Sequence, residues 1–204
     1  EGVVGLVFGL DLLFVALDHD RAGVGFLLFG FLERHEDGLG LGLDLFFLLL
    51  AVAGNETTRN ATAWGMRALV ENPGEYAELV ADPDGLLDSA VEEILRWATP
   101  VLHFRRTALA DTEIGGQPVK AGDKVVMWHI SANRDEAVFD DPFRFDIDRS
   151  PNDHIAFGGG GPHFCLGANL ARLELRLIFR ELVTRIPDME LDGDIDMLRS
   201  NFFG

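Results

Sequence analysis

One stretch of this sequence combines a single soft metal ligand with a loop that a flat ligand can approach closely. Cys165 is the only cysteine, and it follows the glycines Gly158 to Gly161. Glycine lacks a Cβ, so backbone and ligand can come into contact there. Leu166 to Arg185 has helical spacing. The sequence therefore predicts a thiol at a helix N-terminus, where free N–H groups and the helix dipole favour a thiolate.

The residues of this stretch bear differently on three kinds of site. A thiolate is one of the axial ligands that hold haem iron. Zinc is disfavoured, because His163 and Cys165 are two ligands without a second pair at suitable spacing. A phosphate loop is disfavoured too, since no Lys-Ser/Thr pair follows the glycines. The alternative without chemistry is a small buried hydrophobic residue, the commonest state of a lone cysteine.

A second stretch places polar residues inside an apolar helix. Asp44 to Glu71 is predicted to form one long helix, and its first part, Leu45 to Val52, is expected to be buried nearly all round. Polar residues then interrupt it, and buried polar groups are costly unless they are bonded. The Thr57 hydroxyl is placed to perturb the hydrogen bonds of the preceding turn. The alternative is that the helix emerges into solvent at Asn55.

The rest of the chain is predicted to alternate helices, two strands and a long loop. Within the helix Gly85 to Ala98, Glu93 and Arg96 stand three residues apart on one face. Taken alone, such a pair is most often solvated and contributes little. A short helix is predicted over Glu75 to Val80. Two strands, Val101 to Ala108 and Lys124 to Ile130, follow, with a hairpin turn between them at Ile114 to Gln117. The last segment, Ser131 to Pro162, is predicted to be an irregular loop.

Composition limits the classes of partner. The 204 residues include 17 basic and 34 acidic side chains, for a net charge of −17, which argues against nucleic acid and against an anionic membrane surface. One cysteine excludes an internal disulfide framework and suits a reducing cytoplasm. Residues 1–43 are compositionally biased and are expected to be helical and buried. Their apolar run Val3 to Leu17 is shorter than the about 20 residues of a membrane span.

Four motifs in order give the chain a resemblance to a known family. Glu93-Ile-Leu-Arg96, then Pro142-Phe-Arg144-Phe145, then the glycine–cysteine stretch resemble the cytochrome P-450 superfamily. Before them, the element Ala53-Gly-Asn-Glu-Thr57 stands where that family has its oxygen-binding helix. The resemblance covers roughly residues 44 to 201 and implies the C-terminal half of that fold: mainly α with small β-sheets (α+β), with the N-terminal half largely absent. Residues 44–204 would thus be the haem-binding region. In detail the sequence is most similar to actinobacterial hydroxylases of steroid side chains and methyl-branched lipids.

The resemblance implies a haem b site and a role for each matching residue. Cys165 would be the axial ligand of the haem iron. The other cofactor-binding residues would be His163 and Arg106 on the propionates and Phe157, Gly159 and Gly161 in the loop under the ring. Phe157 lies eight residues before Cys165, whereas the family usually places it seven before.

Two further groups of residues acquire roles in the same way. The resemblance implies that Thr57 donates a hydrogen bond to dioxygen and that Glu56 relays protons. Glu93, Arg96 and Arg144 would form a buried structural ion triad, in which an unpaired charge would be costly.

The implied activity is that of a haem-thiolate monooxygenase acting on a C–H bond of an apolar, steroid-like or lipid-like substrate. Electrons would come from NAD(P)H through a ferredoxin and its reductase. The alternative is a truncated haem-binding fragment without catalysis. Arg172, Arg176 and Arg180 recur every four residues, and this stripe has two interpretations: a docking face for an acidic ferredoxin, or a solvated helix face.

Overall fold

The computed structural model describes residues 38–193 and residue 195. The chain divides into two compact units, Glu1–Val52 and Ala53–Gly204. The expectation of a buried helical segment over residues 1–43 falls, for residues 1–37, outside the described residues. Residues 38–43 begin helix α3 (Gly38–Leu49), so the expected helix is present there. Leu43 is exposed, however, so the expected burial is wrong at this position.

The apolar helix α3 differs from the prediction in its surroundings. Leu45, Phe47 and Val52 are all exposed, so the expectation of burial nearly all round is wrong. An apolar composition indicates that the side chains of a helix are to be buried, but it does not show which part of a protein buries them. Among the described residues, no helix is long and apolar enough to cross a membrane.

The predicted long helix is interrupted where its composition changes. A π-helix, Leu50–Gly54, follows α3, and α4 (Asn55–Glu71) continues from it. The Thr57 hydroxyl donates a hydrogen bond of 2.6 Å to the carbonyl of Ala53. This confirms the prediction that Thr57 engages the preceding turn, and a widened turn of this kind is frequent at functional sites.

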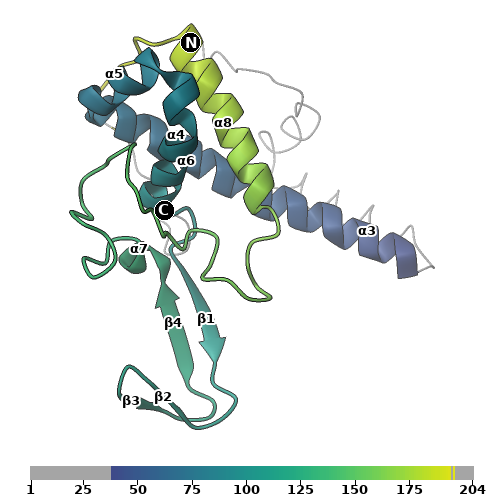
Figure 1. Cartoon of the computed structure of the whole chain (residues 1–204). Coiled ribbons are helices and arrows are strands. Elements are labelled where there is room, and N and C mark those ends of the chain that lie inside the picture. The colour runs from purple at the N-terminus through teal and green to yellow at the C-terminus, as the bar shows by residue number, and fades with distance from the viewer. Residues whose placement is uncertain (1–37, 194, 196–204) are drawn as a thin grey trace. The chain divides into compact units, whose positions relative to one another are not determined.

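In the second unit, four helices form the core: α4, α5 (Pro73–Ala81), α6 (Pro83–Ala98) and α8 (Ala168–Arg185). Figure 1 shows them gathered at one end of this unit. Each contributes fully buried apolar side chains, including Leu69, Leu79, Ile94, Leu175 and Phe179. Burial of such side chains is the main stabilising contribution of this core.

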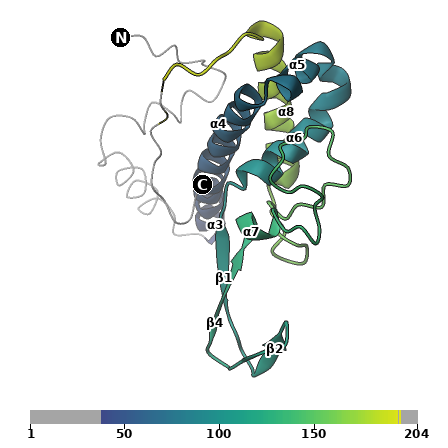
Figure 2. The same ribbon diagram turned by 90° about the vertical axis from the view of Figure 1, so that its left-hand side faces the viewer.

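Two short antiparallel hairpins project from the helices (Figure 2). Strands β1 (His103–Thr107) and β4 (Lys124–Trp128) pair so that Arg106 lies opposite Val125. At the far end, β2 (Thr112–Ile114) pairs with β3 (Gln117–Val119) through the expected turn, in which Gly115 and Gly116 have positive φ. Such a turn strongly favours glycine. The prediction that the last strand reaches Ile130 is wrong, since a helix begins at His129.

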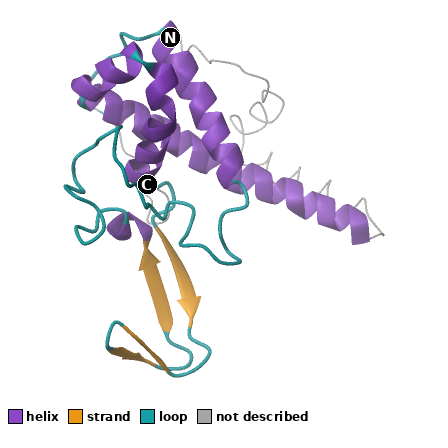
Figure 3. Ribbon diagram, viewed as in Figure 1, coloured by secondary structure: helices purple, strands orange, loops and turns teal. Residues whose placement is uncertain are grey.

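A long irregular segment joins that short helix, α7 (His129–Ala132), to α8. Figure 3 shows it as loop throughout. Two of its side chains, Phe145 and Ile147, are buried against the helical core, and this anchors the segment despite its lack of periodicity. The expected fold class, mainly helical with small β-sheets, is confirmed.

Candidate functional site

The glycine–cysteine stretch forms a closed loop at the start of α8. The backbone N–H of Cys165 donates to the carbonyl of Phe157 at 3.0 Å, and that of Phe164 donates to Gly161 at 3.1 Å. The Cys165 carbonyl then accepts from Ala168, the first residue of the helix, at 3.2 Å. Cys165 is a free and exposed thiol. The expectation of a small buried residue therefore does not describe it.

The glycines give the loop a backbone that other residues would strain. Gly158, Gly160 and Gly161 all have positive φ, between +78° and +95°. At Gly159 an added Cβ would meet no atom within 4 Å, so the space there is open. An exposed thiol beside an open, side-chain-free loop suits a flat ligand with a soft metal at its centre. The residues present therefore fit a haem group ligated through sulfur.

The two expected propionate partners are both exposed, but on different elements. His163 lies in the loop before Cys165, and Arg106 lies on β1. The Arg106 guanidinium donates to the carbonyl of Arg105 at 3.1 Å and lies 5.8 Å from the ring centroid of Phe104. Within the described part of the chain, the structure records no contact between His163 and Arg106.

The expected proton-relay pair is engaged with its own helix. Thr57 is bonded to Ala53, as described above. The Glu56 carboxylate accepts from Arg59 at 2.7 Å. Both side chains are partly exposed, because they lie in the first turn of α4. A carboxylate and a hydroxyl thus occupy consecutive positions of α4, directly after the π-helix.

The expected ion triad is present with a different third member. The Arg96 guanidinium donates two hydrogen bonds of 2.7 Å to Glu93, and both side chains are completely buried. Arg149 is the other partner: its Nε lies 3.2 Å from Glu93 Oε2, and its side chain is only 7 % exposed. Asn152 also donates to this carboxylate, at 3.1 Å. A buried carboxylate with this many donors satisfies the demand for paired, hydrogen-bonded charge.

The assignment of Arg144 to this triad is corrected accordingly. Its side chain is 59 % exposed and lies 3.7 Å from Glu75 and 3.9 Å from Asp146. Only its backbone carbonyl joins the cluster, accepting from Arg96 at 3.1 Å. The physical reason is the course of the loop. At residue 144 the main chain, and not the side chain, faces the cluster, and Arg149 is therefore the loop arginine that contacts the Glu93 carboxylate.

The basic stripe on α8 is matched by an acidic stripe on α6. Arg172 pairs with Glu92 at 2.6 Å, and Arg176 pairs with Asp88 at 2.9 Å. The third pair is that of Arg180 with Asp84. We call these three pairs the α6–α8 ladder. Three positive charges face three negative ones, so the stripe offers little net charge for steering an acidic partner.

The first pair of the ladder also includes a histidine. His154 Nε2 lies 3.0 Å from Glu92 Oε2, and the histidine side chain is 2 % exposed. Burial favours the protonated form of Glu92, but the hydrogen bonds from His154 and Arg172 outweigh it and lower the pKa of Glu92 to about 2. Neither Glu92 nor His154 was predicted from the sequence. The signal that could have found Glu92 is the spacing of Asp84, Asp88 and Glu92, which repeats every four residues as the arginines do.

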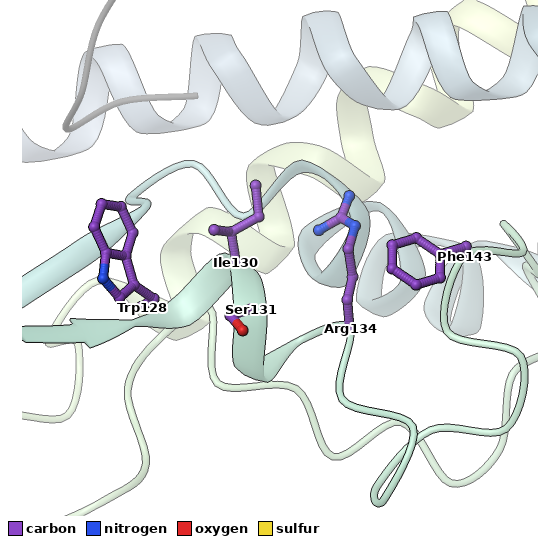
Figure 4. Close-up of a pocket in the computed structure, with 5 residues that line it drawn as sticks. All are labelled: Trp128, Ile130, Ser131, Arg134 and Phe143. Atoms are coloured by element: carbon purple, nitrogen blue, oxygen red, sulfur yellow. The ribbon is translucent and has the colours of Figure 1, made fainter.

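A separate hollow lies at the base of the β1–β4 hairpin. Figure 4 shows its lining: Trp128, Ile130, Ser131, Arg134 and Phe143. Its volume is about 340 Å³, and none of the expected site residues lines it. The arrangement around Cys165, rather than this hollow, therefore carries the candidate chemistry.

Comparison with known proteins places this arrangement in a family. The family model for cytochrome P-450 matches residues 85–186. A methyl-branched lipid omega-hydroxylase from Mycobacterium tuberculosis is 54 % identical over 157 residues, which are 77 % of this chain and 37 % of that protein. A steroid C26-monooxygenase from Mycolicibacterium smegmatis is 47 % identical over 174 residues, or 84 % of this chain and 40 % of that protein. The chain thus spans well under half the length of these relatives.

Solved structures give the same result. A cytochrome P-450 from Mycobacterium marinum in complex with pseudoionone matches with a TM-score of 0.76 and 53 % identity, covering 80 % of this chain and 39 % of that one. A versatile cytochrome P-450 enzyme from Bacillus subtilis matches with a TM-score of 0.76 and 49 % identity, covering 81 % of this chain and 45 % of that one. Together with the thiol loop and the buried Glu93–Arg96 pair, these matches show that the chain belongs to the cytochrome P-450 family.

Proposed function

We propose that this chain is the haem-binding part of a haem-thiolate monooxygenase, with Cys165 as the axial ligand of haem b. The observation that carries the proposal is the exposed thiol, held by a backbone hydrogen bond to Phe157 beside glycines that leave open space. When bound, haem supplies the iron at which dioxygen is activated for insertion of one oxygen atom into a C–H bond.

The remaining predicted residues hold the cofactor and its protons. Phe157, Gly159 and Gly161 form the loop under the ring. His163 and Arg106 bind the propionates, where an arginine offers two charge-assisted hydrogen bonds. Arg106 can turn toward an anion, since its guanidinium is exposed and its contacts in the described residues are a neighbouring carbonyl and the Phe104 ring.

Glu56 and Thr57 hold the protons that the reaction consumes. The Thr57 hydroxyl donates a hydrogen bond to the carbonyl of Ala53, and the adjacent residue, Glu56, has a partly exposed carboxylate. A carboxyl that exchanges protons with water and a neighbouring hydroxyl are the groups of a short proton relay. Loss of either group should uncouple electron consumption from product formation.

The substrate class follows from the names of the relatives. Two of them act on methyl-branched lipids and on steroids, so we propose an apolar, steroid-like or lipid-like substrate. A ferredoxin and its NAD(P)H reductase would supply the electrons. The arginines of α8 are paired with carboxylates of α6 in the α6–α8 ladder, which disfavours this stripe as the docking face for that ferredoxin.

The alternative is a haem-binding chain without catalysis. The test is product formation from a steroid or a methyl-branched fatty acid with ferredoxin, reductase and NAD(P)H. The proposal expects a hydroxylated product with the wild-type chain, none with Cys165→Ser, and increased NAD(P)H consumption per product with Thr57→Ala. A chain that binds haem through Cys165 but forms no product supports the alternative.

A further inference from the structure

The first pair of the α6–α8 ladder differs from the other two in burial and in number of partners. Asp88 and Asp84 are 80 % and 82 % exposed, and each faces a single arginine. Glu92 is 30 % exposed and is held by both nitrogens of a guanidinium fork, at 2.6 and 2.8 Å, and by His154. A bidentate contact of this kind fixes orientation as well as charge.

Both partners of Glu92 reach the base of the cysteine loop. The Arg172 guanidinium lies over the ring of Phe157, 4.6 Å from its centroid, which is a favourable cation–π distance. His154 Nδ1 accepts from the backbone N–H of Ala156 at 3.2 Å. Ala156 and Phe157 are thus held from two sides by groups that Glu92 orients.

Phe157 passes this constraint on to the thiol. Its carbonyl accepts the N–H of Cys165, so the residue under the guanidinium is also the backbone anchor of the cysteine. The glycines between them contribute no packing, because added Cβ atoms at Gly159, Gly160 and Gly161 would meet nothing within 4 Å. A loop with so little packing loses much conformational entropy on ordering, and its geometry must be fixed at its ends.

We infer that Glu92, His154 and Arg172 form a positioning cluster that fixes the Phe157 end of the cysteine loop and so sets the place of the Cys165 sulfur for its ligand. The inference rests on the proposed haem-thiolate function and deepens it. All three are positioning residues, which act through Ala156 and Phe157.

The ladder offers a matched control for this inference. Arg180 and Asp84 have the same chemistry on the same two helices, but they contact no residue of the cysteine loop in the described chain. Arg172→Gln and Glu92→Gln remove the charges of the first pair, whereas Arg180→Gln and Asp84→Asn remove those of the third. Arg172→Lys keeps a cation that can lie on Phe157 and loses the fork.

The first readout needs no haem. Amide hydrogen exchange of Cys165, followed by NMR, reports the bond from Cys165 to Phe157. We expect exchange to become about tenfold faster in Arg172→Gln and Glu92→Gln, as when one backbone hydrogen bond loosens. Arg180→Gln and Asp84→Asn should leave it unchanged, and Arg172→Lys should restore part of the protection.

The second readout is taken on the haem-loaded protein: its haem affinity, its ferrous–CO spectrum and the potential of its iron. Supporting residues behind a metal ligand typically change affinity by about 10- to 100-fold, so Arg172→Gln should weaken haem binding by that factor, reduce the thiolate signature of the ferrous–CO spectrum and shift the iron potential. The inference is overturned if Arg172→Gln and Arg180→Gln behave alike in exchange and in haem binding. If the wild-type chain binds no haem while the exchange difference holds, the proposed function fails and the positioning cluster stands.

Discussion

Arg149 Nε lies 3.2 Å from Glu93 Oε2, although 56 residues separate the two in sequence. This contact fastens the long loop between α7 and α8 to helix α6. The same guanidinium donates to the carbonyls of Asp140 at 2.6 Å and Arg144 at 2.9 Å. One side chain therefore joins a buried carboxylate to several turns of a segment that has no regular structure.

The Arg149 contact predicts a large difference between two arginines of the same loop. Arg149→Gln should lower the free energy of unfolding by about 3 kcal/mol, because it removes a partner from a buried charge. Arg144→Gln should change it by less than about 1 kcal/mol, since the Arg144 side chain is exposed and its ion pairs are long. Urea unfolding of the two variants beside the wild type measures both values. Equal losses would contradict the assignment of Arg149 to the cluster.

The lowered pKa of Glu92 predicts that the free energy of unfolding decreases in acid. Its pKa falls from 4.5 to about 2 on folding. A depressed carboxyl pKa contributes stability that is fully present above about pH 4.5 and is lost as the pH falls toward 2. The contribution is at most on the order of 3 kcal/mol, reduced by solvent because the side chain is partly exposed.

The measurement for Glu92 is the free energy of unfolding between pH 6 and pH 2. The wild type should lose stability over this range more steeply than Glu92→Gln, which has no charge to neutralise. The two curves should therefore converge at the acid end. Parallel curves would show that the hydrogen bonds from His154 and Arg172 do not depress this pKa.

A side chain at Gly65 is predicted to disturb the packing of α4 against Ile94 of α6 and Phe179 of α8. A Cβ there would lie 2.6 Å from Ile94 Cγ2 and 2.8 Å from Phe179 Cζ. Overpacking of this kind costs about 1–3 kcal/mol, which exceeds the gain of up to about 1 kcal/mol from replacing a helical glycine by alanine. Gly65→Ala should therefore lower the melting temperature.

Gly74 is the matched control for Gly65. It lies in helix α5, and an added Cβ would meet nothing within 4 Å. Gly74→Ala should raise the melting temperature or leave it unchanged, because only the helix propensity changes. A higher melting temperature in Gly65→Ala than in Gly74→Ala would show that the helices do not pack as closely as described.

Local spacing predicted the parts of the site that lie on single helices. Glu93 and Arg96 are three residues apart on α6 and form the expected pair. Thr57 engages the carbonyl four residues before it, as its position in an apolar helix indicated. Each of these contacts joins neighbours on one helix face, and this is what helical periodicity reports.

Contacts through the irregular loop lay beyond such reasoning. Arg149 and His154 belong to a segment without periodicity, and so the sequence did not show which of its side chains turn toward α6. Arg144, chosen from its place in a motif, contributes its carbonyl instead. The burial of α3 was predicted from its apolar composition. Composition indicates that a helix is to be buried, but it does not identify the segment that buries it.

The pairing of α6 with α8 was visible in the sequence only in part. The arginines of α8 repeat every four residues. Both interpretations of this stripe, a docking face and a solvated face, treated it as having no partner within the chain. The acidic side chains of α6 repeat with the same spacing, and they satisfy those arginines when the helices pack together. A charge stripe is thus best compared with stripes of the opposite sign before a partner is assigned to it.

Thiolate ligation of haem by Cys165 is the interaction on which the proposed function most directly depends. The decisive measurement is the absorption spectrum of the haem-loaded chain, reduced and exposed to carbon monoxide. We predict the red-shifted Soret band of a thiolate ligand in the wild type and its absence in Cys165→Ser, with both proteins shown to be folded by circular dichroism. A wild-type chain that takes up no haem, or a Cys165→Ser chain with the same red-shifted band, would contradict it.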